Sequence, residues 1–238
     1  MRVVSKFLET ELVEKMDVNS SSIHVCPVPV TFRPHPVSEN KKKYRERIGL
    51  KEDGPVVLYV GRFSKEKNLG MWVNIALRIL NACPDAQFVL VGEGEERDRI
   101  QRIVAEKSSN RFHFMGSVDY DQLSDYYGAA DVFLLCSRYE GYGRVIIEAG
   151  LAGVPVVSTR VASAAALIED GKTGFLEHCE DETGLVNSVM SMLTNDGQRR
   201  AMGLKARQKV HSEQSNDAIS NRLVHVWGSL MEGAVLEN

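Results

Sequence analysis

The run Val56-Val57-Leu58-Tyr59-Val60 begins the part of the sequence in which short apolar segments recur. The later segments of this kind are Gln87–Val91, Asp131–Leu135 and Val154–Val157. Apolar runs of this length are typical of strands that are buried on both faces. Stretches with helical spacing separate them, as in Trp72, Ile75, Ala76 and Ile79. Strands that alternate with helices predict an α/β fold with a doubly wound, parallel, Rossmann-like sheet.

The sequence on either side of this region has a different character. Residues 1–50 contain an amphipathic stretch from Leu8 to Met16 and the basic run Lys41–Lys43, and we interpret them as an N-terminal segment with a linker. The prolines of this segment favour extended chain, and they are Pro27, Pro29, Pro34 and Pro36. Residues 51–212 are expected to form the sheet domain, and residues 213–238 a crossover helix. The last helices are predicted near 181–194, 197–211 and 215–231.

Composition excludes several classes of function. The net charge of -3 provides no excess positive field for a polyanion, so we expect no nucleic-acid partner. The four cysteines are far apart and the six histidines show no ligand spacing, which argues against a metal site. No apolar run approaches the roughly 20 residues that span a bilayer, so the expected location is the cytoplasm.

Ligands of such a sheet bind beyond the carboxyl ends of its strands. The loops at those ends are predicted at 61–68, 92–96, 116–121, 137–143 and 158–166. In the first loop, Arg62 and Lys67 are suited to hold one phosphate-bearing anion between them. The same residues also fit a solvated basic loop, and their spacing alone does not separate the two interpretations.

The loop Gly92–Arg97 superficially resembles a dinucleotide-binding glycine loop. Its glutamates stand where a pyrophosphate would approach, and the first strand is not followed by the G-x-G-x-x-G fingerprint. We therefore expect no nicotinamide or flavin cofactor. Asp119-Tyr120-Asp121 resembles a metal-binding D-x-D motif, but it directly precedes a helical pattern. We expect Asp119 or Asp121 to act as a helix N-cap or first-turn acid, and we predict no metal.

The stretch from Glu140 to Glu148 is the most informative one. Gly141 and Gly143 allow the backbone to approach a ligand closely, and the helix that begins near Gly143 would direct free amides at a phosphate. Glu148 lies inside an apolar helix, where a buried carboxylate needs a partner. A sugar hydroxyl would be one such partner. Pairing of Glu148 with Arg144 is the alternative, and Glu140 also fits an ordinary loop acid.

Taken in order, these loops resemble the C-terminal domain of the retaining GT-B glycosyltransferases of family four, also called glycosyl transferases group 1. The resemblance covers roughly residues 55–210. It rests on the following landmarks: Val60-Gly61-Arg62 through Lys67, Val91–Gly94, Phe114–Gly116, Tyr127–Asp131, Glu140 through Glu148, Gly153–Val157 and Ile168–Leu176.

The resemblance implies a site for a nucleoside diphosphate sugar, UDP- or GDP-linked, whose sugar is transferred with retained anomeric configuration and without an obligatory metal or cofactor. Arg62 and Lys67 would hold the diphosphate, Glu148 the ribose, and Glu140 the transferred sugar. The residues implied in catalysis are Arg62, Lys67 and Glu140. The residues implied in donor binding are Gly61, Arg62, Lys67, Met115, Gly116, Val118, Glu140, Gly141, Tyr142, Gly143, Arg144, Val145 and Glu148.

Two departures from the family pattern limit this expectation. Ala166 stands where the family has the glutamate of a Gly-Gly-x-x-Glu loop. A GT-B enzyme also has an acceptor domain before the donor-binding domain. In this chain only the first residues match that domain, and they match its last elements. We therefore expect that domain to act in cis or in trans, and any membrane association to be peripheral and to occur through it.

The alternative function is a non-catalytic module for nucleotide-sugar binding or interaction. A GT-B epimerase or phosphorylase half has no specific support in the sequence. The helix near 215–231 would pack on the preceding domain, and we expect it to expose apolar side chains, namely Leu223, Val226, Trp227 and Leu230.

Overall fold

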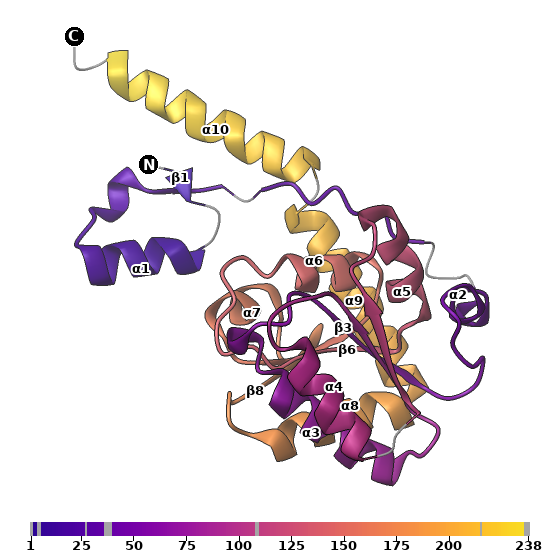
Figure 1. Cartoon of the computed structure of the whole chain (residues 1–238). Helices are drawn as coiled ribbons and strands as arrows, with labels where there is room; N and C mark the ends of the chain where they lie inside the picture. The colour runs from indigo at the N-terminus through magenta and orange to yellow at the C-terminus, as the bar shows by residue number, and fades with distance from the viewer. Residues whose placement is uncertain are drawn as a thin grey trace.

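The computed structural model of the chain describes residues 2–3, 6–26, 28–35, 40–107, 110–214 and 216–235. Its centre is a parallel six-stranded sheet with the order β5-β4-β3-β6-β7-β8 (Figure 1). The strands are β3 (Val56–Val60), β4 (Gln87–Val91), β5 (Phe112–Gly116), β6 (Val132–Leu135), β7 (Val156–Thr159) and β8 (Gly174–Glu177). The doubly wound, Rossmann-like sheet expected from the sequence is confirmed.

The central strands agree best with the sequence pattern. Strands β3 and β4 have the expected bounds, and every residue in both is buried. Strand β7 begins later than expected because the Val154 amide donates to the Ala149 carbonyl and still belongs to the turn after the preceding helix. The edge strands β5 and β8 were not among the predicted strands. Half-buried residues, including His113 and Glu177, interrupt their apolar pattern.

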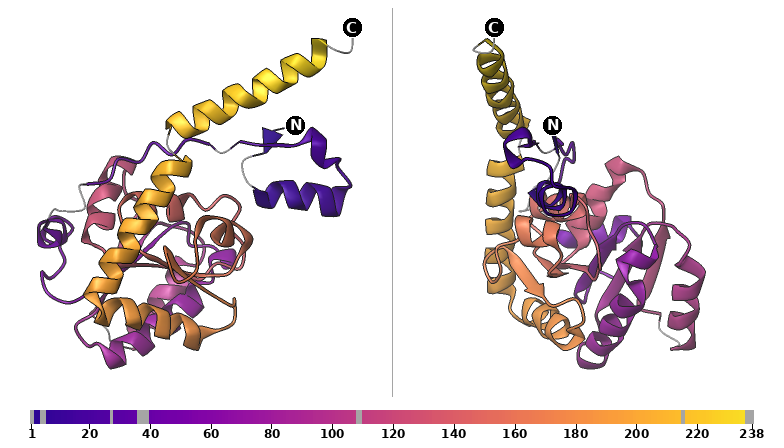
Figure 2. Two further views of the ribbon diagram at one scale, coloured as in Figure 1. Left: turned by 180° about the vertical axis from the view of Figure 1, so that it is seen from behind. Right: turned by 90° about the vertical axis from the view of Figure 1, so that its left-hand side faces the viewer.

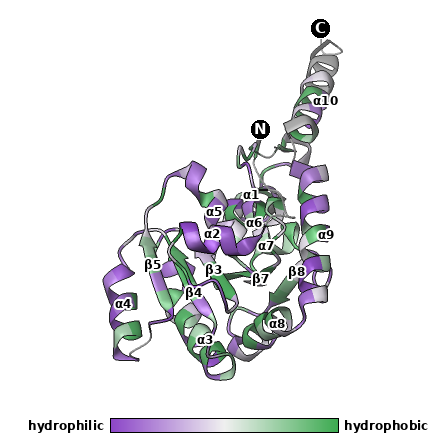
Figure 3. Cartoon of the chain, turned by 90° about the vertical axis from the view of Figure 1, so that its right-hand side faces the viewer, coloured by the Kyte–Doolittle hydropathy of each residue, from purple (hydrophilic) through white to green (hydrophobic). Residues whose placement is uncertain are grey.

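Helices cover both faces of the sheet (Figure 2). One face carries α3 (Leu69–Ala82), α4 (Arg97–Glu106) and α8 (Glu182–Thr194). The other carries α5 (Leu123–Ala129), α6 (Arg144–Leu151), α7 (Ala162–Leu167) and α9 (Asp196–Gln214), with α2 (Lys41–Arg47) packed on α5. Apolar residues concentrate in the strands and in α3, whereas α2 and α9 present many polar ones (Figure 3).

The first residues form a small unit outside the main sheet. Strand β1 (Arg2–Val3) pairs in parallel with β2 (His24–Val25), and α1 (Lys6–Met16) and the 3-10 turn η1 (Ser20–Ser22) connect them. The stretch from Leu8 to Met16 is helical, and α1 contacts α7 of the sheet domain. Residues 28–35 are neither helix nor strand, as their prolines predict, whereas Pro27 and Pro36 lie outside the described residues. The domain boundaries proposed from the sequence stay a prediction.

A buried ion cluster attaches α2 to the sheet. The Asp131 carboxylate accepts from Arg45 Nη2 at 2.7 Å, from Lys41 Nζ at 2.8 Å and from the Val56 amide at 2.8 Å. Burial by itself would raise the pKa of Asp131, but the charges of Lys41 and Arg45 outweigh it and lower this pKa. The cluster therefore joins α2 to the amino ends of β3 and β6.

The last helix, α10 (Asn216–Val235), extends away from the body of the molecule (Figure 2). Trp227 is 67% exposed, which confirms the expectation for this residue. The expectation was wrong for Leu223 and Val226, which are half-buried, whereas the neighbouring Val224 is exposed. The Leu230 side chain lies outside the described part. None of the helices described is long and apolar enough to cross a membrane.

Candidate functional site

The site is built where the strand order changes direction. From β3 the chain proceeds to β4 on one side of the sheet, whereas β6 pairs with the other side of β3. In open α/β sheets, ligands bind outside the carboxyl ends of the strands at such a point. Here the loops after β3 and β6 meet across the sheet edge, since the Arg138 amide donates to the Glu66 carbonyl at 2.8 Å.

The contact between these loops is completed by an ion pair. Lys67 Nζ lies 2.7 Å from Glu140 Oε2, and the side chains are only 16% and 14% exposed. Two residues implied in donor binding and 73 positions apart are thus brought together. Arg62 does not share this partner. Its side chain is exposed and forms no ion pair within the described part of the chain, although its carbonyl accepts from the Tyr59 hydroxyl at 2.8 Å.

Glu148 occupies a second position at this edge, within α6. It is 2% exposed, and its carboxylate accepts from the Tyr127 hydroxyl at 3.0 Å and from Arg144 Nε at 3.0 Å. The pairing with Arg144, considered above as the alternative, is therefore present. Burial raises the pKa of Glu148, and the bonds from Tyr127 and Arg144 oppose this only in part. A carboxylate has about four acceptor positions, so both bonds together leave capacity for a ligand hydroxyl.

The amino end of α6 separates these two carboxylates. Gly143 precedes the helix with φ of 76°, a conformation that favours glycine, and no side chain caps the helix there. A Cβ atom at Gly143 would also meet Leu167 Cδ1 at 2.8 Å. The first amides of a helix, here those of Arg144 and Val145, have no acceptor within it. The hydroxyl of Tyr142, the residue before Gly143, donates to the Val28 carbonyl at 2.8 Å.

Four further residues implied in donor binding lie at the ends of β3 and β5, namely Gly61, Met115, Gly116 and Val118. The Gly61 amide donates to the Val91 carbonyl at 3.0 Å, and the Gly92 amide to the Gly116 carbonyl at 2.8 Å. Met115 and Val118 are half-buried beside them. Two of the three glutamates in the loop after β4 have partners within the protein, because Glu93 pairs with Arg97 and Glu96 pairs with Arg99.

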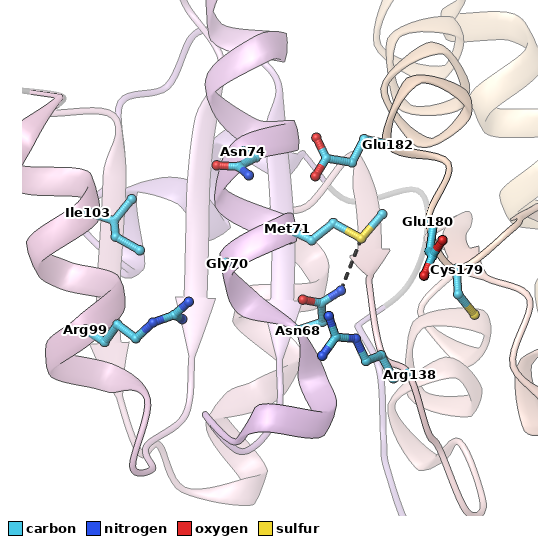
Figure 4. A pocket seen from close by; sticks show the side chains of 10 residues that line it. All are labelled: Asn68, Gly70, Met71, Asn74, Arg99, Ile103, Arg138, Cys179, Glu180 and Glu182. Carbon is cyan, nitrogen blue, oxygen red and sulfur yellow. Dashed lines mark hydrogen bonds between the residues drawn. The ribbon is translucent and has the colours of Figure 1, made fainter.

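One cavity lies next to this site and not within it. It has a volume of about 490 Å³ and lies between α3, α4 and residues 179–182 (Figure 4). Asn68 and Arg138 connect it with the two loops above, and Arg99 reaches it from α4. None of the residues implied in donor binding lines it.

Comparison with known proteins assigns this architecture to a family. Residues 40–209 match the family described as Glycosyl transferases group 1. The chain belongs to this glycosyltransferase family. The family expected from the sequence is thereby confirmed, and the six-stranded sheet matches those of GT-B glycosyltransferases.

One relative and two solved structures that resemble the chain are each longer than it is. It is 31% identical over 182 residues to the 2-deoxystreptamine N-acetyl-D-glucosaminyltransferase of Niallia circulans, with 76% of this chain and 46% of the relative covered. Sucrose-phosphate synthase from Thermosynechococcus elongatus has a TM-score of 0.84 at 28% identity, with 98% and 58% covered. HepE from Anabaena, in complex with UDP and glucose, has a TM-score of 0.81 at 21% identity, with 96% and 62% covered. The chain spans about half the length of the curated relatives it matches.

The family resemblance implied a glutamate in the loop that ends at residue 166, and the present chain departs from it there. Ala166, at the position of the expected glutamate, is exposed on α7 and supplies no carboxylate. The sequence also did not indicate Tyr127 as a partner of Glu148. A tyrosine on a helix with apolar spacing is typical of a core residue, so its pattern contained no signal of this role.

The Asp119-Tyr120-Asp121 motif lies at the start of a helical region, as expected from the sequence. Asp119 is the N-cap residue of a 3-10 turn, η3 (Tyr120–Gln122), and Asp121 lies in its first turn, which confirms their expected positions, although the Asp119 side chain makes no capping hydrogen bond. Both aspartates are exposed. Within the described ranges, no group of three or more His, Cys, Asp and Glu side chains is arranged to hold a metal ion.

Proposed function

We propose that this chain is the donor-binding part of a retaining glycosyltransferase that uses a UDP- or GDP-linked sugar. The observation that supports this most is the arrangement around the open amino end of α6. The Lys67–Glu140 pair lies at the loops that meet there, and the buried Glu148 carboxylate lies within the helix itself. An elongated donor would find a separate position for each of its parts. The lysine and the free amides suit its phosphates, and the two carboxylates suit its sugar and its ribose.

The proposed roles follow from the charge of each group. Lys67, Arg62 and the amides of Arg144 and Val145 bind the diphosphate. When Lys67 turns to a phosphate, Glu140 is released to accept a hydroxyl of the sugar. Negative charge grows on the diphosphate as the glycosidic bond breaks, so these donors stabilise the transition state more than the bound donor. Retention of the anomeric configuration is proposed from the family resemblance.

The acceptor is proposed to bind to the part of the relatives' length that this chain does not span. Such a domain would act in cis or in trans with the residues described above. A non-catalytic module that only binds nucleotide sugars is the second candidate. It is favoured by one observation, namely that Ala166 offers no carboxylate to the sugar.

Calorimetric titration with UDP, GDP and their sugar conjugates tests the proposal. We expect the Lys67→Ala variant to bind the preferred nucleotide and bare pyrophosphate roughly 10- to 100-fold more weakly, the loss typical of a hydrogen bond to a charged group. Lys65→Ala is the matched control, because Lys65 is exposed in the same loop and carries the same charge. It should change affinity less than about twofold. If the unmodified chain binds no nucleotide at millimolar concentration, the proposal is wrong.

A further inference from the structure

Three buried hydroxyls in the described part of the chain have no hydrogen-bond partner, and they belong to Tyr120, Ser137 and Ser163. All three follow the carboxyl ends of strands, Tyr120 after β5, Ser137 after β6 and Ser163 after β7. Buried polar groups are nearly always hydrogen-bonded, because an unpaired one retains the cost of its dehydration. Their position at this edge of the sheet indicates that a polar ligand is the missing partner.

Tyr120 is the one whose surroundings identify the ligand group. The Arg144 guanidinium lies 4.6 Å from the centre of its ring, and Phe32 packs edge-on against the ring at 6.2 Å between centroids. Arg144 also binds Glu148, so the Tyr120 hydroxyl lies beside the Glu148–Arg144 pair. Short contacts with Arg144 and Glu148 both affect the pKa of this hydroxyl. Neither contact meets the geometry of a hydrogen bond.

The hydroxyl of Tyr120 is available as a donor at neutral pH. Burial raises its pKa above the ordinary tyrosine value, Arg144 opposes this rise and Glu148 adds to it. The phenol therefore keeps its proton throughout the physiological range. The Glu148 carboxylate, in contrast, only accepts while it is ionised.

A ligand group placed between a phenol donor and a carboxylate acceptor must both accept and donate a hydrogen bond. A phosphate oxygen would be repelled by Glu148, and an apolar ring face would leave the phenol unpaired. An alcohol satisfies both groups at once. We propose that Tyr120 is a further donor-binding residue, whose phenol donates to the ribose hydroxyl that in turn donates to Glu148. This inference rests on the proposed function.

The Tyr120→Phe variant tests the inference, because it removes only the hydroxyl. The ligands are the nucleoside diphosphate that the unmodified chain prefers, its 2′-deoxy and 3′-deoxy analogues, and pyrophosphate, all measured by calorimetry. We expect about a tenfold loss of affinity for the nucleoside diphosphate, the effect of one hydrogen bond. Pyrophosphate binding should not change. One of the two deoxy analogues should bind the variant and the unmodified chain equally well.

Tyr126→Phe is the matched control, since Tyr126 is a half-buried tyrosine of α5 whose pKa responds to burial and to Asp125, not to Glu148. It should leave all four affinities unchanged. Thermal melting separates a binding role from a packing role. Loss of an unpaired hydroxyl should leave the Tm of free Tyr120→Phe equal to that of the unmodified chain, or higher.

Two results would overturn the role of Tyr120 and leave the proposed function intact. One is nucleotide binding that Tyr120→Phe does not weaken. The other is a lower Tm together with equal losses for the nucleotide and for pyrophosphate, which would indicate a packing role. Absence of nucleotide binding by the unmodified chain would instead contradict the proposed function itself, and the Tyr120 inference with it.

Discussion

At the scale of single residues, Glu148 combines burial with a charge. Its side chain is almost inaccessible, and its charged partner Arg144 remains 53% exposed. An ion pair with so exposed a partner contributes little, so it does not compensate for the dehydration of the carboxylate. We interpret Glu148 as a residue retained for ligand binding at some cost in stability.

The Glu148→Gln variant should therefore be more stable than the unmodified chain at pH 7. Because the folded-state pKa of Glu148 is raised, its protonation favours the folded state below the ordinary value of 4.5, and this contribution is lost as pH rises through the folded-state pKa. Glutamine has no charge at any pH, so it avoids the loss of stability that accompanies ionisation of Glu148. Its amide oxygen can still accept a hydrogen bond from the Tyr127 hydroxyl. We expect Tm to rise by roughly 2–4 °C, equivalent to about 1 kcal/mol at this size.

Thermal melts from pH 3 to pH 8 provide the measurement. The difference between Glu148→Gln and the unmodified chain should disappear at acidic pH, where the glutamate is protonated in both states. Glu106→Gln, at an exposed position near the end of α4, is the control and should show no such trend. A destabilised Glu148→Gln at pH 7 would show that the Arg144 pair outweighs burial.

At the scale of elements, glycines set the distance between α6 and α9. A Cβ atom at Gly150 of α6 would approach Val210 Cγ2 to 2.6 Å, and one at Gly203 of α9 would approach the Gly153 carbonyl oxygen to 2.0 Å. The second contact involves backbone, which yields less easily than a side chain. Close packing of α9 therefore holds the helix that carries Arg144 and Glu148.

Gly203→Ala should destabilise the protein by about 1–3 kcal/mol, as is typical of overpacking, despite the better helix propensity of alanine. Gly197→Ala is the matched control in the same helix, because its new methyl group would meet only Asn195 Oδ1, at 3.7 Å. It should be neutral or should stabilise by up to about 1 kcal/mol. Urea unfolding measures both variants, and equal effects would contradict the packing argument.

At the scale of the whole molecule, the N-terminal segment touches the candidate site. Phe32 packs edge-on against Tyr127, with ring centroids 5.2 Å apart, and Tyr127 in turn binds Glu148. The Tyr142 hydroxyl binds the Val28 carbonyl. Movement of residues 28–35 would thus be transmitted to both sides of the amino end of α6. We infer that the geometry of the site depends on the position of residues 28–35 and of the segment that precedes them.

We therefore expect this chain alone to bind nucleotide sugars but to transfer sugar poorly. Transfer should appear when an N-terminal half from a related glycosyltransferase is added in trans or fused. Product analysis by NMR should then show the anomeric configuration of the donor. Multiple turnovers by the chain alone would contradict the proposal that the acceptor site lies elsewhere, and an inverted product would contradict retention.

The sequence by itself determined the central sheet and the family. Strands β3 and β4 were predicted with their observed bounds because burial on both faces makes all their residues except Gln87 largely apolar, a pattern that is visible locally. The apolar surroundings of Glu148 indicated a buried carboxylate for the same reason. Edge strands were missed, since one-sided exposure of β5 and β8 mixes polar residues into the pattern.

Only the tertiary structure decided which side chains meet at the site. The Lys67–Glu140 pair depends on β6 lying beside β3, and no local pattern encodes that order of strands. Tyr120 and Tyr127 looked like ordinary helix-associated aromatics until the fold placed them beside Glu148 and Arg144. Local periodicity reports burial, whereas the partners of a buried group depend on contacts between segments far apart in the chain.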